Sequence, residues 1–337
     1  MRCGPAAQLG QIRYGGVSAI PHSLLVHQYL RVALFVFVVF SIYLAAAGFA
    51  WAKTRGSKPQ RPLLRALEIA LYFAVVVGSV CILYAYTVEP YWPQVTHVAL
   101  SSPKLHAPLR IVHLSDLHAD GKVRLEKRLP ELVREQHPDL IVFTGDTVMT
   151  HEGVPLAKDV LAQFAAIAPT YVVPGNWDVE MAREWHQNIA HPPFFAGTGV
   201  HNLTGQAGTV EIHGEPVWIA GAASNQEHLL PALLQTAPAD HFSILLFHFP
   251  DEVQSVNQSR IDLYLAGHTH GIALPFYGAL ITYSRFDKKY ESGLHRIGNA
   301  WLYVNRGIGL DGHPPRARFC ARPEITVIDI SPAAAHP

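Results

Sequence analysis

Two long apolar runs stand near the start of the chain. Residues 32–52 contain no charged side chain, and residues 69–88 form a second uncharged run. Each is about the length that crosses ~30 Å of hydrocarbon as a helix. Two buried core helices are the alternative, although core helices rarely lack a polar face over such a length. The pattern predicts a two-helix transmembrane anchor over residues 31–88, preceded by an N-terminal segment, residues 1–30.

From residue 109 onward the pattern changes to short apolar runs that alternate with stretches of helical spacing. Strands are predicted at 109–114, 140–144 and 171–173, and helices at 123–136, 157–167 and 178–188. The second half is richer in strands, predicted at 209–212, 217–220, 244–247, 263–266, 301–305 and 325–330. This alternation predicts an α/β domain, with two packed sheets and helices outside them. We place that domain at residues 109–332, after a linker over residues 89–108.

Basic residues are concentrated between the two apolar runs. The loop holds Lys53, Arg55, Lys58, Arg61 and Arg65, whereas few positive charges follow the second run. Three arginines precede the first run and weaken this contrast. The positive-inside rule places the loop in the cytoplasm and both flanks outside, so the α/β domain is expected on the extracytoplasmic side.

The charge balance and the cysteine positions exclude some kinds of partner and site. Lys+Arg and Asp+Glu both number 26, so no basic field indicates a nucleic-acid partner. The three cysteines are far apart and form neither a zinc motif nor a disulfide framework.

Polar residues that can hold metal ions follow five of the predicted strands. In chain order they are Asp116 and His118, Asp146, Asn176, His248, and the pair His268 and His270. Alternate side chains of extended chain point the same way, so Asp116 and His118 can hold one ion while Leu117 points away. Each motif by itself is weak, and a single histidine at a strand end is more often structural. Five in order, with mixed imidazole and carboxylate ligands, indicate a site for Zn, Mn or Fe.

This series, D-x-H, G-D, G-N-x-D, H and G-H-T-H, resembles the calcineurin-like metallophosphoesterases, over residues 109–330. The stretches GHTHGIALPFYGAL, LYVNRGIG and RPEITVIDI are similar to the bacterial membrane-associated branch of phosphodiesterases. The resemblance implies a four-layer α/β/β/α sandwich and two divalent metal ions. Together with the two predicted spans, the resemblance to this bacterial branch predicts a multi-pass protein of the bacterial inner membrane, so that the bilayer is a partner.

The resemblance further implies a role for each residue. Asp116, His118 and His270 would hold the first ion, while Asn176, His248 and His268 would hold the second. Asp146 would bridge both. Asp146, Asn176 and His248 are also taken as catalytic, because two such ions activate a bridging hydroxide that attacks the phosphorus in line with the leaving group.

One position departs from the family pattern. The residue after the metal-binding asparagine is usually a histidine that helps the leaving oxygen, and here it is Trp177. His151, His295 and His313 are possible substitutes, although structural roles are expected for them. Trp177 and Arg306 are taken as substrate-binding residues, with a structural salt bridge as the alternative for Arg306. Asp178 is expected to cap a helix instead of binding metal.

These observations predict a membrane-anchored phosphohydrolase acting on a phosphodiester or pyrophosphate, including a lipid-linked one. Two alternatives remain open. One is a pyrophosphatase of the UDP-2,3-diacylglucosamine type, whose cytoplasmic substrate conflicts with the predicted topology. The other is a weakly catalytic metal-binding sensor or scaffold that lost its acid at Trp177.

Overall fold

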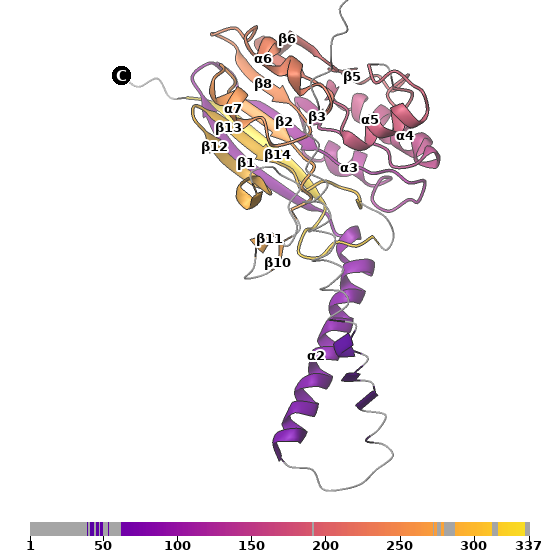
Figure 1. Cartoon of the computed structure of the whole chain (residues 1–337). Helices are drawn as coiled ribbons and strands as arrows, with labels where there is room; N and C mark the ends of the chain where they lie inside the picture. The colour runs from indigo at the N-terminus through magenta and orange to yellow at the C-terminus, as the bar shows by residue number, and fades with distance from the viewer. Residues whose placement is uncertain are drawn as a thin grey trace, which may run out of the picture. The chain divides into compact units, whose positions relative to one another are not determined.

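The computed structural model describes residues 62–190, 192–271, 273–274, 278–279, 287–311 and 316–333, with scattered positions between 39 and 53. The chain divides into two compact units, Met1–Val77 and Gly78–Pro337. Helix α2 (Pro62–Thr87) runs across the boundary between them. Figure 1 shows the elements in chain order.

The prediction of two transmembrane helices is not supported, because the described residues contain one candidate helix. Within the described part of the chain, a single stretch, Tyr72–Tyr91, is long and apolar enough to cross a membrane. Its apolar side chains are exposed, as Phe73 at 70% and Leu83 at 62% illustrate. The other predicted span, residues 32–52, lies largely outside the described residues.

The second unit contains two six-stranded mixed sheets (Figure 1). In spatial order the first sheet contains β1 (Gln94–Ser102), β14 (Glu324–Pro332), β2 (Leu109–Leu114), β3 (Leu140–Phe143), β4 (Thr170–Val172) and β5 (His201–Asn202). The second contains β12 (Gly293–Ile297), β13 (Ala300–Val304), β9 (Leu263–Ala266), β8 (Phe242–Leu246), β7 (Glu215–Gly221) and β6 (Gln206–Ile212). A separate two-stranded ribbon pairs β10 (Ala273–Leu274) with β11 (Gly278–Ala279).

The two sheets pack face to face with helices on their outer sides. Ile111 and Val142 of the first sheet share an apolar core with Ile219 and Leu265 of the second. A second core joins the outer face of the first sheet to α3 (Leu129–Arg134), α4 (Val154–Ala165) and α5 (Asn176–Glu184). A third joins the second sheet to α6 (Leu230–Leu234) and α7 (Val253–Asn257). The predicted α/β class is therefore confirmed, with its layers in the order helix, sheet, sheet, helix.

Most predicted strands lie where the apolar runs placed them, and β2 and β9 match to the residue. Helix α3 begins only at Leu129 and is shorter than predicted. In the loop before it, Asp120 accepts two hydrogen bonds from Arg124. The predicted linker, residues 89–108, contains the 3-10 helix η1 (Glu89–Tyr91) and strand β1. Strand β1 pairs in parallel with β14 from Gln94 to Ser102, so this stretch is part of the first sheet.

Strand directions bring several loops to one edge of the sandwich. Strands β2, β3 and β4 run parallel, and so do β7, β8 and β9, so the loops that follow them lie at common edges. Strand β14 runs antiparallel to β2 and pairs Thr326 with His113, which is three residues before Asp116. Because β1 is parallel to β14, the chain also enters the first sheet at this edge, at Gln94.

Candidate metal centre

Two groups of side chains meet where the loops of the two sheets converge. Asp116, His118 and His270 form the first ligand group, and Asp146, His248 and His268 form the second ligand group. In each group one ligand atom from every residue lies within 4.8 Å of the others, and all but the partly buried His268 are buried. The structure thus brings together six of the seven residues predicted as ligands, and Asn176 joins them through His248.

The backbone at these loops turns sharply. Asp116, His118, Asp146, His268 and His270 all have positive φ angles, between 46° and 74°. Non-glycine residues rarely adopt this region, at a cost of about 1–3 kcal/mol each, and such strain is concentrated at functional sites. The turns direct the side chains back over the strand ends toward one another.

Two glycines allow these turns to approach one another closely. A Cβ atom at Gly175 would lie 2.1 Å from Asp146 Oδ1, and one at Gly267 would lie 2.3 Å from Asp116 Oδ2. Any larger residue would push these carboxylates away, so G-N and G-H in the motifs have a steric reason.

The first ligand group is arranged around two facing imidazoles. His118 Nε2 and His270 Nε2 lie 3.1 Å apart, and Asp116 Oδ1 lies 3.4 Å from His270 Nε2 and 3.8 Å from His118 Nε2. The backbone N–H of His268 donates to Asp116 Oδ2 at 3.1 Å and holds that carboxylate in place. Asp146 Oδ2 lies 3.7 Å from His118 Nε2, so Asp146 touches both groups.

The second ligand group has the arrangement expected of a metal-binding histidine. His248 Nδ1 lies 2.7 Å from the carbonyl oxygen of Thr144, which can only accept, so Nδ1 carries the proton. In the neutral ring Nε2 then presents a lone pair to Asp146 Oδ2 at 3.2 Å and to Asn176 Oδ1 at 3.0 Å. A proton on Nε2 or a metal ion between these atoms would relieve the repulsion among their lone pairs, and a backbone partner on the other ring nitrogen is the usual support of a metal ligand.

Electrostatics agree with cation binding. Burial opposes ionisation of Asp146, but His248, with smaller effects of His118 and His268, outweighs burial and holds the pKa of this carboxyl at about 2. Burial also opposes protonation of His248, but Asp146 raises its pKa to about 9, so in the metal-free protein a proton occupies this place. Burial lowers the pKa of His268 to about 3 and that of His270 well below its usual value. These two imidazoles are therefore neutral, which is the form that binds metals.

Asp178 supports the second ligand group without facing it. Its buried carboxylate accepts hydrogen bonds from the backbone N–H groups of Gly175, Thr147 and Val148, at 3.0, 2.9 and 3.2 Å. It thereby caps α5 and fixes the turn that carries Asp146. The predicted capping role is confirmed.

Trp177 lies beside the first ligand group and is held at both ends. Its backbone N–H donates to Asp146 Oδ1 at 2.8 Å, and its indole Nε1–H donates to Asp311 Oδ1 at 3.0 Å. The indole stands edge-on to His118, with ring centroids 6.2 Å apart. Trp177 therefore forms part of the wall of the site, and sequence reasoning missed its partner Asp311.

Arg306 makes the structural salt bridge that was the alternative for it. Its guanidinium bonds both carboxylate oxygens of the buried Glu324, each at 3.2 Å, and reaches Gln94 Oε1 at 3.3 Å. Of the three possible substitutes for the missing histidine, His151 packs against Trp185 in a tilted arrangement, with ring centroids 4.8 Å apart. His295 donates to the carbonyl of Ser292 at 3.0 Å. His313 lies outside the described residues.

Arg318 is a buried residue that the motifs did not reveal. Its Nη2 lies 3.3 Å from His270 Nδ1, and its Nε donates to the carbonyl of Gly309 at 2.8 Å. Its Nη1 donates to the carbonyls of Arg306 and Ala321. The available signal was the alternation of arginines at 316 and 318 shortly before the last strand, and it is a weak one.

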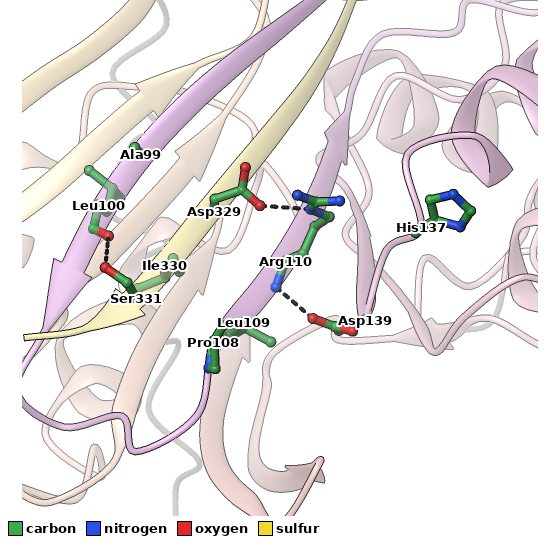
Figure 2. Close-up of a pocket in the computed structure, with 10 residues that line it drawn as sticks. All are labelled: Ala99, Leu100, Pro108, Leu109, Arg110, His137, Asp139, Asp329, Ile330 and Ser331. Carbon is green, nitrogen blue, oxygen red and sulfur yellow. Dashed lines mark hydrogen bonds and ion pairs between the residues drawn. The ribbon is translucent and has the colours of Figure 1, made fainter.

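A pocket of about 380 Å³ lies at the other end of the first sheet (Figure 2). Arg110 crosses it, with Nε 2.7 Å from Asp329 Oδ1 and its backbone N–H 2.7 Å from Asp139 Oδ2. These residues lie near the start of β2 and the end of β14, whereas the two ligand groups follow the end of β2. The pocket is therefore separate from the metal centre.

Comparison with known proteins agrees with this geometry. The profile of the calcineurin-like phosphoesterases matches residues 109–271. The chain is 32% identical over 274 residues to the uncharacterized metallophosphoesterase YkuE of Bacillus subtilis (strain 168), which spans 73% of this chain and 88% of YkuE. It is 30% identical over 258 residues to the phosphodiesterase YaeI of Escherichia coli (strain K12), which spans 73% of this chain and 92% of YaeI.

A more distant relative carries a different activity in its name. The UDP-2,3-diacylglucosamine pyrophosphatase LpxG of Chlamydia trachomatis serovar D is 25% identical over 304 residues, which span 73% of this chain and 91% of LpxG. Taken with the converging ligand groups, the family match and the 32% identity to YkuE show that this chain belongs to the calcineurin-like phosphoesterases and is a metal-dependent phosphoester hydrolase.

Proposed function

We propose that the chain is a membrane-anchored phosphodiesterase that uses two divalent metal ions. The observation that carries this proposal is the position of Asp146, whose Oδ2 lies 3.7 Å from His118 of one group and 3.2 Å from His248 of the other. Asp116, His118 and His270 would hold the first ion. Asn176, His248 and His268 would hold the second, and Asp146 would contribute to both.

The residues of the chain prepare this centre before any substrate arrives. Bound divalent cations would lower the pKa of water and neutralise the charge on two phosphoryl oxygens during in-line attack. The backbone N–H groups of His268 and Trp177 fix the carboxylates of Asp116 and Asp146. The carbonyl of Thr144 fixes the ring of His248. Because these supports are already bonded, the ligands need little reorganisation when a phosphoester binds.

Phosphodiester or pyrophosphate bonds are the proposed substrates, with YaeI, named a phosphodiesterase, as support. The alternative is pyrophosphate cleavage in a UDP-diacylglucosamine-type lipid precursor, for which the similarity to LpxG is the specific observation. A weakly catalytic sensor or scaffold is the third hypothesis, motivated by Trp177 at the position of the usual histidine.

A substrate screen separates these hypotheses. The full chain, purified in detergent, is assayed with Mn²⁺, Zn²⁺ and Fe²⁺ against a phosphomonoester, a phosphodiester and a UDP-linked sugar. Hydrolysis of the diester alone is the expected result. Preference for the UDP-linked substrate would favour the lipid-precursor alternative, and absence of turnover with every metal would favour the scaffold.

The proposed topology places the domain from Leu109 onward outside the cytoplasmic membrane, with the basic loop of residues 53–65 inside. Support comes from the charge distribution and from the exposed apolar helix Tyr72–Tyr91. Alkaline phosphatase, which is active only outside the cytoplasm, is fused after Lys58 and, in a second protein, after Pro337. We expect activity in the second fusion only. An inactive fusion at Pro337 would overturn the topology and raise the lipid-precursor alternative.

A further inference from the structure

The apolar helix ends at the edge of the domain that carries the metal centre. Strand β1 begins at Gln94, which pairs with Glu324 at the start of β14, and β14 runs back along the end of β2. The chain reaches β1 from the final turn of α2 by way of η1 and the two residues Trp92 and Pro93. The point at which the chain leaves the apolar helix is therefore at the same edge as Asp116, not at the opposite edge, where the pocket of Figure 2 lies.

Hydrogen bonds connect this helix end to the segment 318–321. The backbone N–H of Arg318 donates to the carbonyl of Ala85, in the last turn of α2, at 3.1 Å. Glu89 of η1 is fully buried and accepts from the backbone N–H groups of Cys320, at 2.9 Å, and Ala321. Three bonds thus fix the helix end to one segment.

The same segment reaches the first ligand group. Arg318 Nη2 lies 3.3 Å from His270 Nδ1, and Arg318 Nε bonds the carbonyl of Gly309, whose own N–H donates to the carbonyl of Asp116 at 2.6 Å. One residue, Arg318, therefore separates the end of the apolar helix from a predicted metal ligand. The end of the apolar helix and the first ligand group thus both contact Arg318.

The exposed side chains at this edge suit a bilayer surface. Trp92, Val123 and Tyr91 are exposed at 52%, 48% and 44%, and the Arg322 guanidinium lies 4.0 Å from the centre of the Trp92 ring. The loop with Val123 belongs to this edge, because Asp120 accepts from Arg316 Nη1 at 2.8 Å, two residues before Arg318. Aromatic rings combined with basic groups are typical of the membrane interface, where the rings enter the headgroup layer and the basic groups meet lipid phosphates.

We propose that this edge, defined by Tyr91, Trp92, Val123 and Arg322, rests on the leaflet in which α2 ends, and that the metal centre acts on the phosphoester of a lipid in that leaflet. This inference rests on the proposed function and names its substrate class. A lipid confined to the surface is presented to the centre at a high effective concentration, which a soluble phosphoester does not share.

The test compares two substrates with the same reacting bond. Dioleoylglycerol 4-nitrophenyl phosphate is placed in phosphatidylcholine vesicles that contain the full chain, and the dibutyryl analogue is supplied in solution. We expect kcat/KM at least about tenfold higher for the dioleoyl substrate, falling as more phosphatidylcholine dilutes it within the surface at constant bulk concentration. Equal values for both substrates, unaffected by surface dilution, would overturn the inference.

Two variants test whether the preference for the dioleoyl substrate depends on the proposed membrane-facing edge. Val123→Asp puts a charge into the proposed lipid contact, whereas Ala239→Asp puts the same charge on an exposed residue before β8, at the opposite edge. We expect Val123→Asp to lower the dioleoyl rate by about fivefold or more and to leave the dibutyryl rate unchanged. Ala239→Asp should change neither, and equal losses in both variants would also overturn the inference. If neither substrate were hydrolysed with Mn²⁺, Zn²⁺ or Fe²⁺, the phosphodiesterase proposal would fail, and this inference with it.

Discussion

The two ligand groups are built from the same kinds of side chain but are supported differently. In the second group, the carbonyl of Thr144 holds His248, and the N-terminal turn of α5 holds Asp146. In the first group, the guanidinium of Arg318 lies 3.3 Å from His270 Nδ1, where it can only donate. A carbonyl behind an imidazole strengthens it as a ligand, whereas a positive charge beside it opposes a cation.

We expect the two groups to differ in their affinity for a metal ion. The second is anchored in the main chain of the first sheet and should hold its ion tightly. The first is tied through Arg318 to the end of the apolar helix and should hold its ion more weakly. Because Asp146 contacts both groups, its loss should weaken metal binding in both, so that the difference in affinity between them disappears.

The largest effect is expected from Asp146→Ala. Without the shared carboxylate, two cations would repel each other across the centre, so both ions should be lost and hydrolysis should fall by at least about a thousandfold. Elemental analysis of the purified variant measures this directly. Asp178→Asn is the matched control, because Asp178 is equally buried but bonds only backbone N–H groups and a hydroxyl. It should lose stability and keep both ions, and two retained ions in Asp146→Ala would refute the shared role.

Removal and return of metal should separate the two groups. Metal-free protein titrated with Mn²⁺ should bind in two phases whose affinities differ by about tenfold or more, because only the first group lies beside the Arg318 charge. His248→Ala should abolish the tight phase and His270→Ala the weak one. Calorimetry measures both phases, and a single phase with two equal sites in the wild type would contradict the asymmetry.

Substitution of Trp177 tests whether the site lacks a proton donor for the leaving group. An alkyl leaving group benefits from a general acid by roughly 10²–10⁴ in rate, whereas an aryl leaving group needs little protonation. The wild type should therefore show kcat/KM falling steeply as the leaving-group pKa rises. Trp177→His should flatten that slope by raising alkyl rates more than aryl rates.

The control is Trp177→Phe, which removes the bond to Asp311 but adds no titratable group, so its slope should stay steep. A shallow slope in the wild type would mean that another group supplies the proton. Trp177 would then serve to bind a sugar, a nucleobase or an acyl chain.

The smallest effect on catalysis is expected at Arg306. Its guanidinium is bonded to Glu324 and Gln94, so Arg306→Gln should lower the free energy of unfolding by about 1–3 kcal/mol. KM for a phosphodiester should change by less than about twofold. Thermal unfolding and steady-state kinetics on the same sample measure both, with Arg306→Lys as the control that keeps the charge. A large rise in KM with unchanged stability would restore the substrate-contact hypothesis.

The sequence by itself determined the strands and the residues that follow them. Short apolar runs such as LRIVHL and LYLA are typical of buried strands, and this pattern can be read from neighbouring residues alone. Strands β2 and β9 were therefore predicted to the residue. The residues that converge at the candidate metal centre could also be predicted, because each stands shortly after such a run.

Tertiary structure decided the partners of those residues. Strand β1 was not predicted and fell within the predicted linker. It is only partly buried, and its pairing partner, β14, lies more than two hundred residues away. Arg318 next to His270 and Asp311 next to Trp177 depend on segments that meet only when the two sheets pack. A side chain's neighbours across such distances leave no periodic trace in the sequence, since they are set by strand order and direction. That is why the candidate ligands could be predicted from the chain, while what orients them, and which edge the apolar helix joins, could not.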